Sequence, residues 1–373
     1  MSVQFFPTYE QVLRSKFGGL IFDVREFGAD PTGAEDSTGA INACGAAASL
    51  TGGARYYPSG TYKVSDSIQM YPNVDEVGEL GMTGLTEGDS VLVGTVLSVA
   101  PGNYDVFSPP SGTMKGRWIV NLSFDGAPGQ FNSCIKLEVA EQCVIANVGM
   151  RCGGAALNFI LIDGGSGGAY GNLIINCSAA CGFGYVGGDA FKIGATSVGN
   201  VNTLINCNAL SFARGVNFNY GSGNRSYGAW TQSCTTGVRF GEGQGNVARD
   251  TYWESNTTDV LFDTNSVDSL VDGGNPAAPL VVTATVPGKI TNVATYNPRG
   301  PVTVAVPASG TATAALPYDA TFYITQATAA SSIAVQGQTI AIPVGGPTAI
   351  RVPAGQTLTP TYTTAPTWVV MGD

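Results

Sequence analysis

The residues of this sequence that are best suited to chemistry are carboxylates, because the chain contains no histidine. Histidine is the commonest general base and the commonest metal ligand, so its absence removes both roles. Glycoside hydrolysis remains open, since it needs two carboxyl groups roughly 5 to 9.5 Å apart, one of them kept protonated. The candidate catalytic residues are Glu242, Asp263, Glu254 and Asp189.

Two pairings of these carboxylates are predicted. Glu242 and Asp263 follow two similar strands and are expected on neighbouring turns of a repeat. Glu254 and Asp189 are expected to reach a similar separation on neighbouring or next-but-one turns. Asp189 precedes an apolar residue in VGGDAFKIG, where a turn residue is the alternative interpretation. Nucleophilic catalysis by Ser or Cys is disfavoured because no His partner exists.

β-Elimination from a uronate is the alternative chemistry. It would need an Arg, Lys or Tyr base, for which Arg239, Arg225, Tyr220 and Tyr227 are available. It usually also needs calcium held by clustered carboxylates, and no Asp cluster with calcium spacing is visible in the sequence. We therefore expect neither a metal nor a cofactor.

A repeat must position these side chains, and five segments of the chain end alike. Ile193 and Phe218 are 25 residues apart, and the next two steps are 22 residues each. Such a recurrence indicates a solenoid whose turns stack, with the segment ends above one another in the core. The segments are ALNF at Phe159, AFKI at Ile193, GVNF at Phe218, GVRF at Phe240 and DVLF at Phe262.

Strand alternation then predicts which residues face outward. Asn158, Lys192, Asn217 and Arg239 lie between inward residues, so Lys192, Asn217 and Arg239 should form an outward polar file about 5 Å apart from turn to turn. We take these three, with Tyr220 after the strand, as candidate substrate-binding residues. An ordinary solvated face is the alternative. A second internal file is predicted for Cys177, Cys207, Cys234 and Asn256.

Trp230 and Tyr252 are a second group of candidate substrate-binding residues, beside Trp253 and Glu254. Exposed aromatic rings stack on sugars, and a neighbouring carboxylate can bind hydroxyl groups. Both alternations of these strands carry apolar residues, so the outward side is not defined here. Trp230 could equally belong to the core.

The amino-terminal part contains an ordered pattern over about forty residues. It stands as FGADPTG, EDST, AINACGAAA, GG and PSGTY within residues 22–64. Asp36 or Ser37 can cap a helix of small residues that ends at Gly52 and Gly53. This pattern resembles the start of the pectate-lyase-superfamily right-handed β-helix proteins, especially bacteriophage tailspikes. Gly39 and Tyr57 depart from it slightly.

The resemblance implies an all-β fold: a right-handed parallel β-helix with an amino-terminal capping helix. It does not define chemistry, because the same cap occurs on lyases, hydrolases and inert spikes. The paired Asp, Gly-His-Gly and Arg-x-Lys set of the polygalacturonase branch is absent, and without histidine it could not be complete.

Composition limits the partners. The net charge of −10 disfavours nucleic acid and anionic membranes, although a local arginine cluster could still hold an anionic polysaccharide. No run of residues is long and apolar enough for membrane insertion. The eight cysteines form no CxxC pair, so we expect small buried hydrophobes and assembly in a reducing compartment, the host cytoplasm.

Four regions are predicted. Residues 1–21 form an attachment peptide with a short helix, 22–64 the cap, 65–274 the parallel β-helix, and 275–373 an antiparallel β-sandwich-like domain. The last region is nearly free of charge, and its resemblance to tailspike ends implies a homotrimer. The attachment peptide, residues 1–21, would join a phage tail or baseplate protein, which implies a virion location.

Three functions remain open from the sequence. The first is a phage tailspike that recognises and cleaves a bacterial surface polysaccharide, either capsule or O-antigen. The second is a spike that binds such a polysaccharide without cleaving it. The third is a secreted polysaccharide lyase or hydrolase of a cellular organism, which should carry a secretory signal that the first residues lack.

Overall fold

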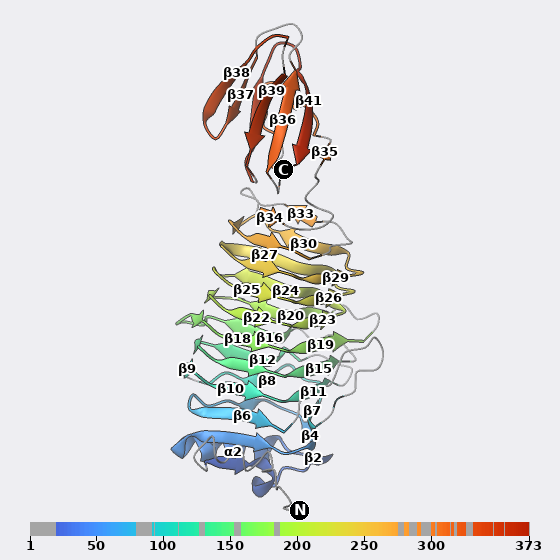
Figure 1. The fold of residues 1–373 in the computed structure, drawn as a ribbon. Coiled ribbons are helices and arrows are strands. Elements are labelled where there is room, and N and C mark those ends of the chain that lie inside the picture. The colour runs from blue at the N-terminus through green and yellow to red at the C-terminus, as the bar shows by residue number, and fades with distance from the viewer. Residues whose placement is uncertain are drawn as a thin grey trace, which may run out of the picture.

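A computed structural model describes residues 20–79, 92, 94–110, 112–126, 131–152, 158–182, 187–274, 280–282, 289–291, 300–302, 304–313, 315–316, 319–325, 331–345, 347–353 and 355–372. It confirms the predicted fold: stacked turns of parallel strands form a long solenoid, with antiparallel sheets near the carboxyl terminus (Figure 1). The predicted helix before Gly18 lies outside the described residues.

Two long parallel sheets run along the solenoid, one strand per turn. Sheet A consists, in spatial order, of β1 (Ile21–Asp23), β3 (Gly53–Tyr57), β6 (Val74–Gly78), β10 (Trp118–Val120), β14 (Val144–Ala146), β18 (Leu173–Ile175), β22 (Thr203–Ile205), β25 (Arg225–Tyr227), β28 (Val247–Arg249), β32 (Leu270–Asp272) and β34 (Lys289–Thr291). Sheet B consists of β2 (Thr32–Asp36), β4 (Gly60–Val64), β7 (Thr95–Val99), β11 (Ser123–Gly126), β15 (Gly149–Cys152), β19 (Ser178–Cys181), β23 (Asn208–Leu210), β26 (Trp230–Gln232) and β29 (Tyr252–Glu254).

A third long sheet and a short fourth one complete the turns. Sheet C consists of β5 (Ile68–Gln69), β8 (Asp105–Ser108), β12 (Ser133–Glu138), β16 (Asn158–Asp163), β20 (Gly187–Ile193), β24 (Phe212–Tyr220), β27 (Thr236–Gln244), β30 (Thr258–Phe262) and β33 (Leu280–Val282), with β31 (Ser266–Val267) beside β27. Sheet D consists of β9 (Met114–Lys115), β13 (Ala140–Glu141), β17 (Ala169–Tyr170) and β21 (Gly199–Asn200).

The predicted phenylalanine file is confirmed where its spacing is regular. Phe218 pairs with Phe240 and Phe240 with Phe262 in the ladders of β24, β27 and β30, and all three side chains are fully buried. The rings of Phe240 and Phe262 stack with centroids 4.8 Å apart. Each turn therefore buries its apolar face only against its neighbours, as a solenoid requires.

The predicted register of the first member of that file, Phe159, was wrong by three residues. Asn158 pairs with Asp189, and Ile162, not Phe159, pairs with Ile193. β16 is buried at five of its six positions, so its apolar pattern does not distinguish the two faces. The letters ALNF resemble the later segments, but backbone pairing defines a different register.

The predicted cysteine file combines two separate files. Ser178 pairs with Asn208, which places Cys177 beside Cys207, but Asn208 then pairs with Trp230, so Cys207 is followed by Ala229. Cys234 instead donates its N–H to Asn256 at the other end of the sheet B segment. All eight cysteines are buried and free of disulfides, in agreement with their role as small core residues.

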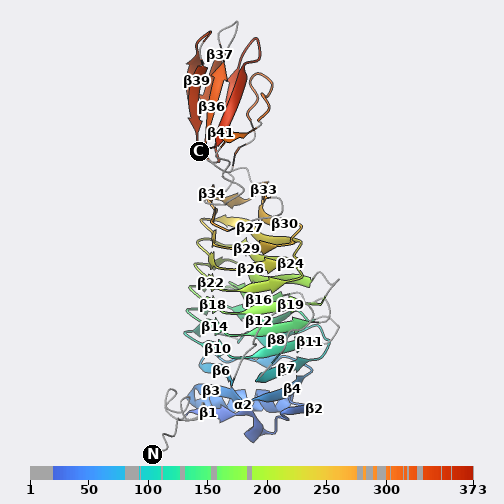
Figure 2. The ribbon, with the colours of Figure 1, turned by 45° about the vertical axis from the view of Figure 1, so that its right-hand side comes forward.

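The cap contains the helix that the sequence predicted. α2 (Thr38–Thr51) begins after Ser37 and ends at Gly52, and the 3-10 helix η1 (Val24–Phe27) precedes it. The Asp36 carboxylate accepts the N–H and hydroxyl of Thr38, whereas Ser37 occupies the cap position without a capping side-chain bond and accepts the Asp30 N–H instead. The helix covers the first turns of the solenoid (Figure 2).

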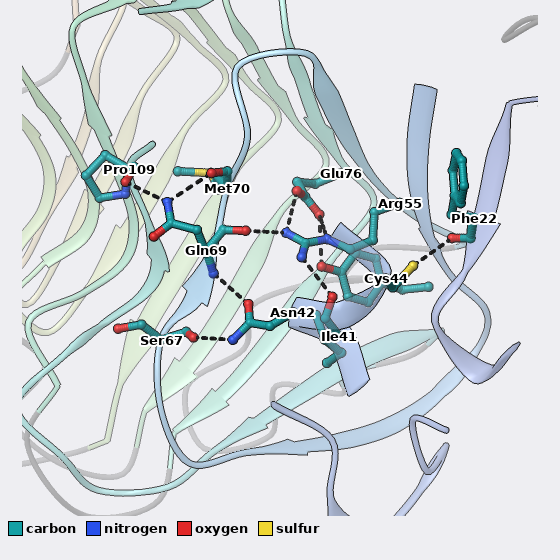
Figure 3. A network of polar contacts seen from close by, with 11 residues as sticks. Phe22, Ile41, Asn42, Cys44, Arg55, Ser67, Gln69, Met70, Glu76 and Pro109 are labelled. Carbon is teal, nitrogen blue, oxygen red and sulfur yellow. Dashed lines mark hydrogen bonds and ion pairs between the residues drawn. The ribbon is translucent and has the colours of Figure 1, made fainter. Parts of the chain in front are cut away.

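Under this helix lies a buried ion pair that the sequence did not indicate. Arg55 donates from Nη2 and Nε to both Glu76 oxygens at 2.6 and 2.8 Å, and both side chains are almost completely buried. The guanidinium also donates to the carbonyls of Ile41 and Gln69, each at 3.0 Å (Figure 3). Gly45 makes room for it, because a Cβ there would lie 2.2 Å from Arg55 Nη1. This arrangement joins the helix to the first two turns.

A buried asparagine ladder stabilises one inner corner of the solenoid. The side-chain oxygens of Asn202, Asn224 and Asn246 accept the backbone N–H of the preceding asparagine, at 2.9 to 3.1 Å, starting from Asn172. Each buried amide thereby satisfies backbone groups that a turn leaves unpaired.

The carboxyl-terminal region has its own core between two antiparallel sheets, as predicted. One sheet contains β35 (Gly300–Val302), β41 (Thr367–Gly372), β36 (Ala320–Thr325) and β39 (Pro347–Val352), and the other β38 (Gln338–Ile342), β37 (Ser331–Val335) and β40 (Leu358–Thr361). The solenoid extends further than predicted, because β33 and β34 still pair in parallel beyond residue 274.

Candidate functional site

A polar hollow of about 530 Å³ lies where the strands of sheet C end and the chain turns toward sheet A. We call it the Glu242 hollow. Its lining residues are Ala195, Thr196, Asn219, Tyr220, Arg239, Gly241, Glu242, Asp263, Thr264 and Asn265. It therefore contains the predicted pair Glu242 and Asp263 together with two of the predicted substrate-binding residues, Tyr220 and Arg239.

Arg239 organises one wall of this hollow. Its Nε donates to Asp263 Oδ2 at 3.1 Å, and its Nη2 forms a further short contact with the same oxygen. Its Nη1 donates to Asn219 Oδ1 at 2.7 Å and Asn217 Oδ1 at 3.1 Å. The hydrogen bond from Arg239, with the Thr264 N–H, lowers the pKa of Asp263, so this carboxylate stays ionised and does not suit a general acid.

Glu242 and Tyr220 form the more exposed part of the hollow. They are directly paired in the ladder of β24 and β27, so their side chains leave adjacent turns at the same point. Glu242 is exposed and Tyr220 half-buried. Among the described residues the Glu242 carboxylate makes neither a hydrogen bond nor an ion pair. It remains available to a ligand or to solvent.

Backbone and a fixed loop form the floor. A Cβ on Gly241 would lie 2.5 Å from the Asn219 carbonyl, and one on Gly194 would lie 2.0 Å from that of Tyr220, so glycine is needed at both places. The neighbouring loop is held by Asp163, which accepts the N–H groups of residues 195–197 and the Thr196 hydroxyl. Burial alone would raise the pKa of Asp163, but these donors lower it.

The other members of the predicted polar file are less open: Lys192 is half-buried and Asn217 is buried. Lys192, Asn217 and Arg239 are in register, as predicted, yet Asn217 is fully buried. Asp189 is also buried and accepts from Asn217 at 2.8 Å and from Arg214 Nε, with Lys192 Nζ 3.8 Å away. Lys192 and Arg214 share the single Asp189 carboxylate, so this part of the file forms internal ion pairs and is not an open row of side chains.

Trp230 and Tyr252 face outward on sheet B, so the outward side of these strands, which the sequence left open, is now defined. They pair directly, their ring centroids lie 6.2 Å apart edge to face, and Tyr252 is 52% exposed. Trp253 points into the core. The adjacent hollow measures only about 10 Å³, too little for a sugar ring, so this surface could offer stacking but no enclosed site.

The pairing of Glu254 with Asp189 was wrong. Glu254 ends β29 in sheet B, whereas Asp189 lies on β20 in sheet C, three turns earlier. Three turns correspond to about 14 Å along the solenoid. This exceeds the separation that either glycosidase mechanism uses.

A second hollow, of about 600 Å³, follows further along the same turns and was not foreseen. We call it the Asp268 hollow. Its lining residues are Asn200, Val201, Ser222, Gly223, Gln244, Gly245 and Asp268. The Gly-Asn pairs at 171–172, 223–224 and 245–246 mark this corner in the sequence and could have revealed it.

In the part of the chain that the structure describes, no group of three or more Cys, Asp or Glu side chains is arranged to hold a metal ion. Across those same described residues, no helix has the length and apolar character needed to cross a membrane.

Comparison with known proteins gives a family and a fold. The model of the family described as rhamnogalacturonase A/epimerase, pectate lyase-like, matches residues 21–250. No curated protein matches the chain. Among solved structures, 57 chains match, and those that follow illustrate the range.

ORF18 of Geobacillus virus E2 is 15% identical with a TM-score of 0.50, and the match covers 98% of this chain and 82% of that one. DFA-IIIase from Arthrobacter chlorophenolicus A6 in complex with GF2 is 13% identical with a TM-score of 0.50, covering 73% and 85%. The N-terminal fragment of gene product 12 of bacteriophage Phi29 is 13% identical with a TM-score of 0.47, covering 73% and 57%. For the virus protein and DFA-IIIase, the likeness at these identities shows a shared fold alone.

Proposed function

Because the chain belongs to the rhamnogalacturonase A/epimerase, pectate lyase-like family, we propose that it is a phage spike protein that binds a bacterial surface polysaccharide at the Glu242 hollow. The observation that carries this proposal is the hollow itself, a polar depression of about 530 Å³ with a rigid backbone floor. Tyr220 offers a ring face, and Glu242 with the exposed Thr264 and Asn265 offers hydrogen-bonding groups, which is the mixture that sugars need.

Two further features support the phage class. A virus protein shares the fold over 98% of the chain, including the carboxyl-terminal region. The eight buried thiols suit assembly in a reducing host cytoplasm before incorporation into a virion tail. We extend the proposal to attachment through the residues before 20 to a tail or baseplate protein.

A homotrimer joined through the carboxyl-terminal domain is part of the same proposal. Four of the five residues of β38 are exposed, and this strand lies at the edge of its sheet. Asp319 and Arg351, which pair with each other, are the charged residues among those described after residue 300. Edge strands without charges readily pair with another chain. Absolute mass in solution, with an unheated SDS gel, tests this point: a monomer would exclude it.

Cleavage is the second candidate function, favoured by the two carboxylates on neighbouring turns of one hollow. Asp263 is held ionised by Arg239, so Glu242 would have to act as the general acid. The register places Asp263 beside Gly241, one residue before Glu242. This arrangement resembles a charge-stabilising carboxylate next to an acid.

One experiment separates the two functions. Purified chain is mixed with capsules and lipopolysaccharides from a panel of bacteria, and bound polysaccharide, new reducing ends and unsaturated products are all measured. Binding without products supports a recognition spike. New reducing ends that disappear in Glu242→Gln, while binding falls less than about threefold, would support hydrolysis. No binding to any polysaccharide would refute the proposed function.

A further inference from the structure

Two hollows lie on the same turns of the solenoid, and on two of those turns a single glycine separates their linings. Gly221 lies between Tyr220 of the Glu242 hollow and Ser222 of the Asp268 hollow, and Gly243 lies between Glu242 and Gln244. A Cβ on Gly243 would lie 2.0 Å from the Gly221 carbonyl oxygen, and one on Gly221 equally close to that of Gly199. Because no larger residue fits at either glycine, the ridge between the hollows carries no side chain on these two turns.

The ridge is held from inside by the buried asparagine ladder. Asn224 Nδ2 donates to the Gly199 carbonyl at 2.8 Å, and Asn246 Nδ2 donates to that of Gly221 at 2.9 Å. The ridge carbonyls are thus satisfied internally and their positions are fixed. A ligand crossing from one hollow to the other would meet a preorganised surface and would lose little free energy in ordering it.

Apart from Asp268 and Val201, the side chains that line the Asp268 hollow are neutral and polar. The Ser222 N–H donates to Asn200 Oδ1 at 2.7 Å, and the Gln244 N–H donates to Ser222 Oγ at 3.1 Å. Val201 adds an apolar group, 54% exposed, in a left-handed conformation that is costly for a β-branched residue. Amides, a hydroxyl and one small apolar side chain suit hydroxyl or N-acetyl substituents of a sugar.

The charges of the two hollows favour one class of glycan. Glu242 and Asp268 are exposed, and neither carboxylate has a hydrogen bond or ion pair among the residues that the structure describes. The cation in the lining, Arg239, is already occupied by Asp263 and two asparagines. Lys192 and Arg214 contact the Asp189 carboxylate and line neither hollow. The surface is therefore net negative.

We infer that the two hollows form one continuous binding surface for an oligosaccharide that is neutral or carries amino groups, and that acidic glycans are rejected. This inference rests on the proposed glycan-binding function and names its substrate class. The carboxylates of Glu242 and Asp268 would repel the negative charges of an acidic glycan. They would attract a protonated amino group and so strengthen binding of an amino-bearing glycan.

Matched ligands test the charge rule. Purified acidic capsules are bound to the full chain both as isolated and after chemical reduction of their carboxyl groups to alcohols, beside naturally neutral and amino-bearing polysaccharides. We expect neutral, amino-bearing and reduced polysaccharides to be bound, with native acidic forms at least about tenfold weaker than their reduced counterparts. The double variant Glu242→Gln with Asp268→Asn should narrow that difference to less than about threefold, whereas the remote control Glu26→Gln should leave it unchanged.

Three outcomes contradict different parts of the inference. Acidic forms bound as tightly as their reduced counterparts, with binding lost in Arg239→Met, would overturn the charge rule and leave glycan binding intact. Unchanged affinity in Ser222→Trp, which fills the Asp268 hollow, beside lost affinity in Tyr220→Ala would restrict the site to the Glu242 hollow. Failure to bind any polysaccharide would refute the proposed function and the inference with it.

Discussion

Two arginine–carboxylate clusters in this molecule have similar chemistry and opposite settings. In the cap, Arg55 and Glu76 are buried, and the guanidinium is saturated by carboxylate and carbonyl oxygens. At the corner between sheets C and A, Arg239 and Asp263 lie in the wall of an open hollow, beside a Glu242 carboxylate that no described residue pairs with. A cluster that satisfies itself holds the fold together, whereas one that leaves a carboxylate free offers a binding surface.

The physical difference is one of desolvation. Burial opposes the charge of Arg55, but the Glu76 carboxylate outweighs it and raises the pKa of the guanidinium, so removing either partner would leave the other as an uncompensated buried charge. At the corner, solvent still reaches the Asp263 and Glu242 carboxylates, so losing one contact costs little. Mutations should therefore affect stability at the cap and binding at the corner.

The largest effect is expected from Arg55→Met. It leaves the Glu76 carboxylate buried without its partner, and breaking such a pair costs about 3–5 kcal/mol. The free energy of unfolding from urea titration measures it, with Arg25→Ala as the control. Arg25 pairs with the mostly buried Asp23 but is itself 48% exposed, so water can replace the guanidinium and its loss should cost only about 1 kcal/mol. An equal loss of unfolding free energy in the two variants would contradict the difference between the buried and the more exposed ion pair.

Two glycines of α2 provide a matched pair with opposite expected signs. Gly45→Ala should destabilise by about 1–3 kcal/mol, because its methyl group would displace the Arg55 guanidinium. A Cβ on Gly39 would meet no atom within 4 Å, so Gly39→Ala should stabilise by about 0.4–1 kcal/mol through a less flexible unfolded chain. Thermal unfolding of both variants checks this, and a neutral Gly45→Ala would contradict close packing of the guanidinium.

A smaller effect should appear with pH at the corner. Asp163 and Asp263 have lowered pKa values in the folded protein, so their stabilisation is complete above the usual carboxyl pKa of about 4. It is lost as the pH falls from about 4 through the lowered values. Urea unfolding at pH 7, 5 and 3 should show a constant free energy and then a decline. Asp263→Asn should reduce that decline by less than about 1 kcal/mol, and an unchanged decline in Asp163→Asn would argue against these assignments.

The fold was predictable because its signals are periodic. Phe218, Phe240 and Phe262 recur at the length of one turn, and the cap pattern has a defined order. The register failed at Phe159 because β16 is apolar on both faces. The cysteine file failed because Cys207 and Cys234 lie at different ends of a sheet B segment.

The candidate site was predictable where residues follow regular strands. Tyr220, Arg239, Glu242 and Asp263 come together because their strands have equal spacing. Burial of Asn217 could not be foreseen, since it depends on Arg239 folding back over it. Arg55 gave no periodic signal at all: only Gly45, a small residue inside the helix, marks the space that its side chain fills.

The most direct test of the central claim compares two aromatic residues on different faces, Tyr220 at the corner and Tyr252 on sheet B. The affinity of the full chain for a bound surface polysaccharide is measured for Tyr220→Ala and Tyr252→Ala, after thermal unfolding shows that both remain folded. We predict that Tyr220→Ala weakens binding at least about tenfold, and Tyr252→Ala less than about twofold. The reverse result would move the site to sheet B and contradict the account of the corner.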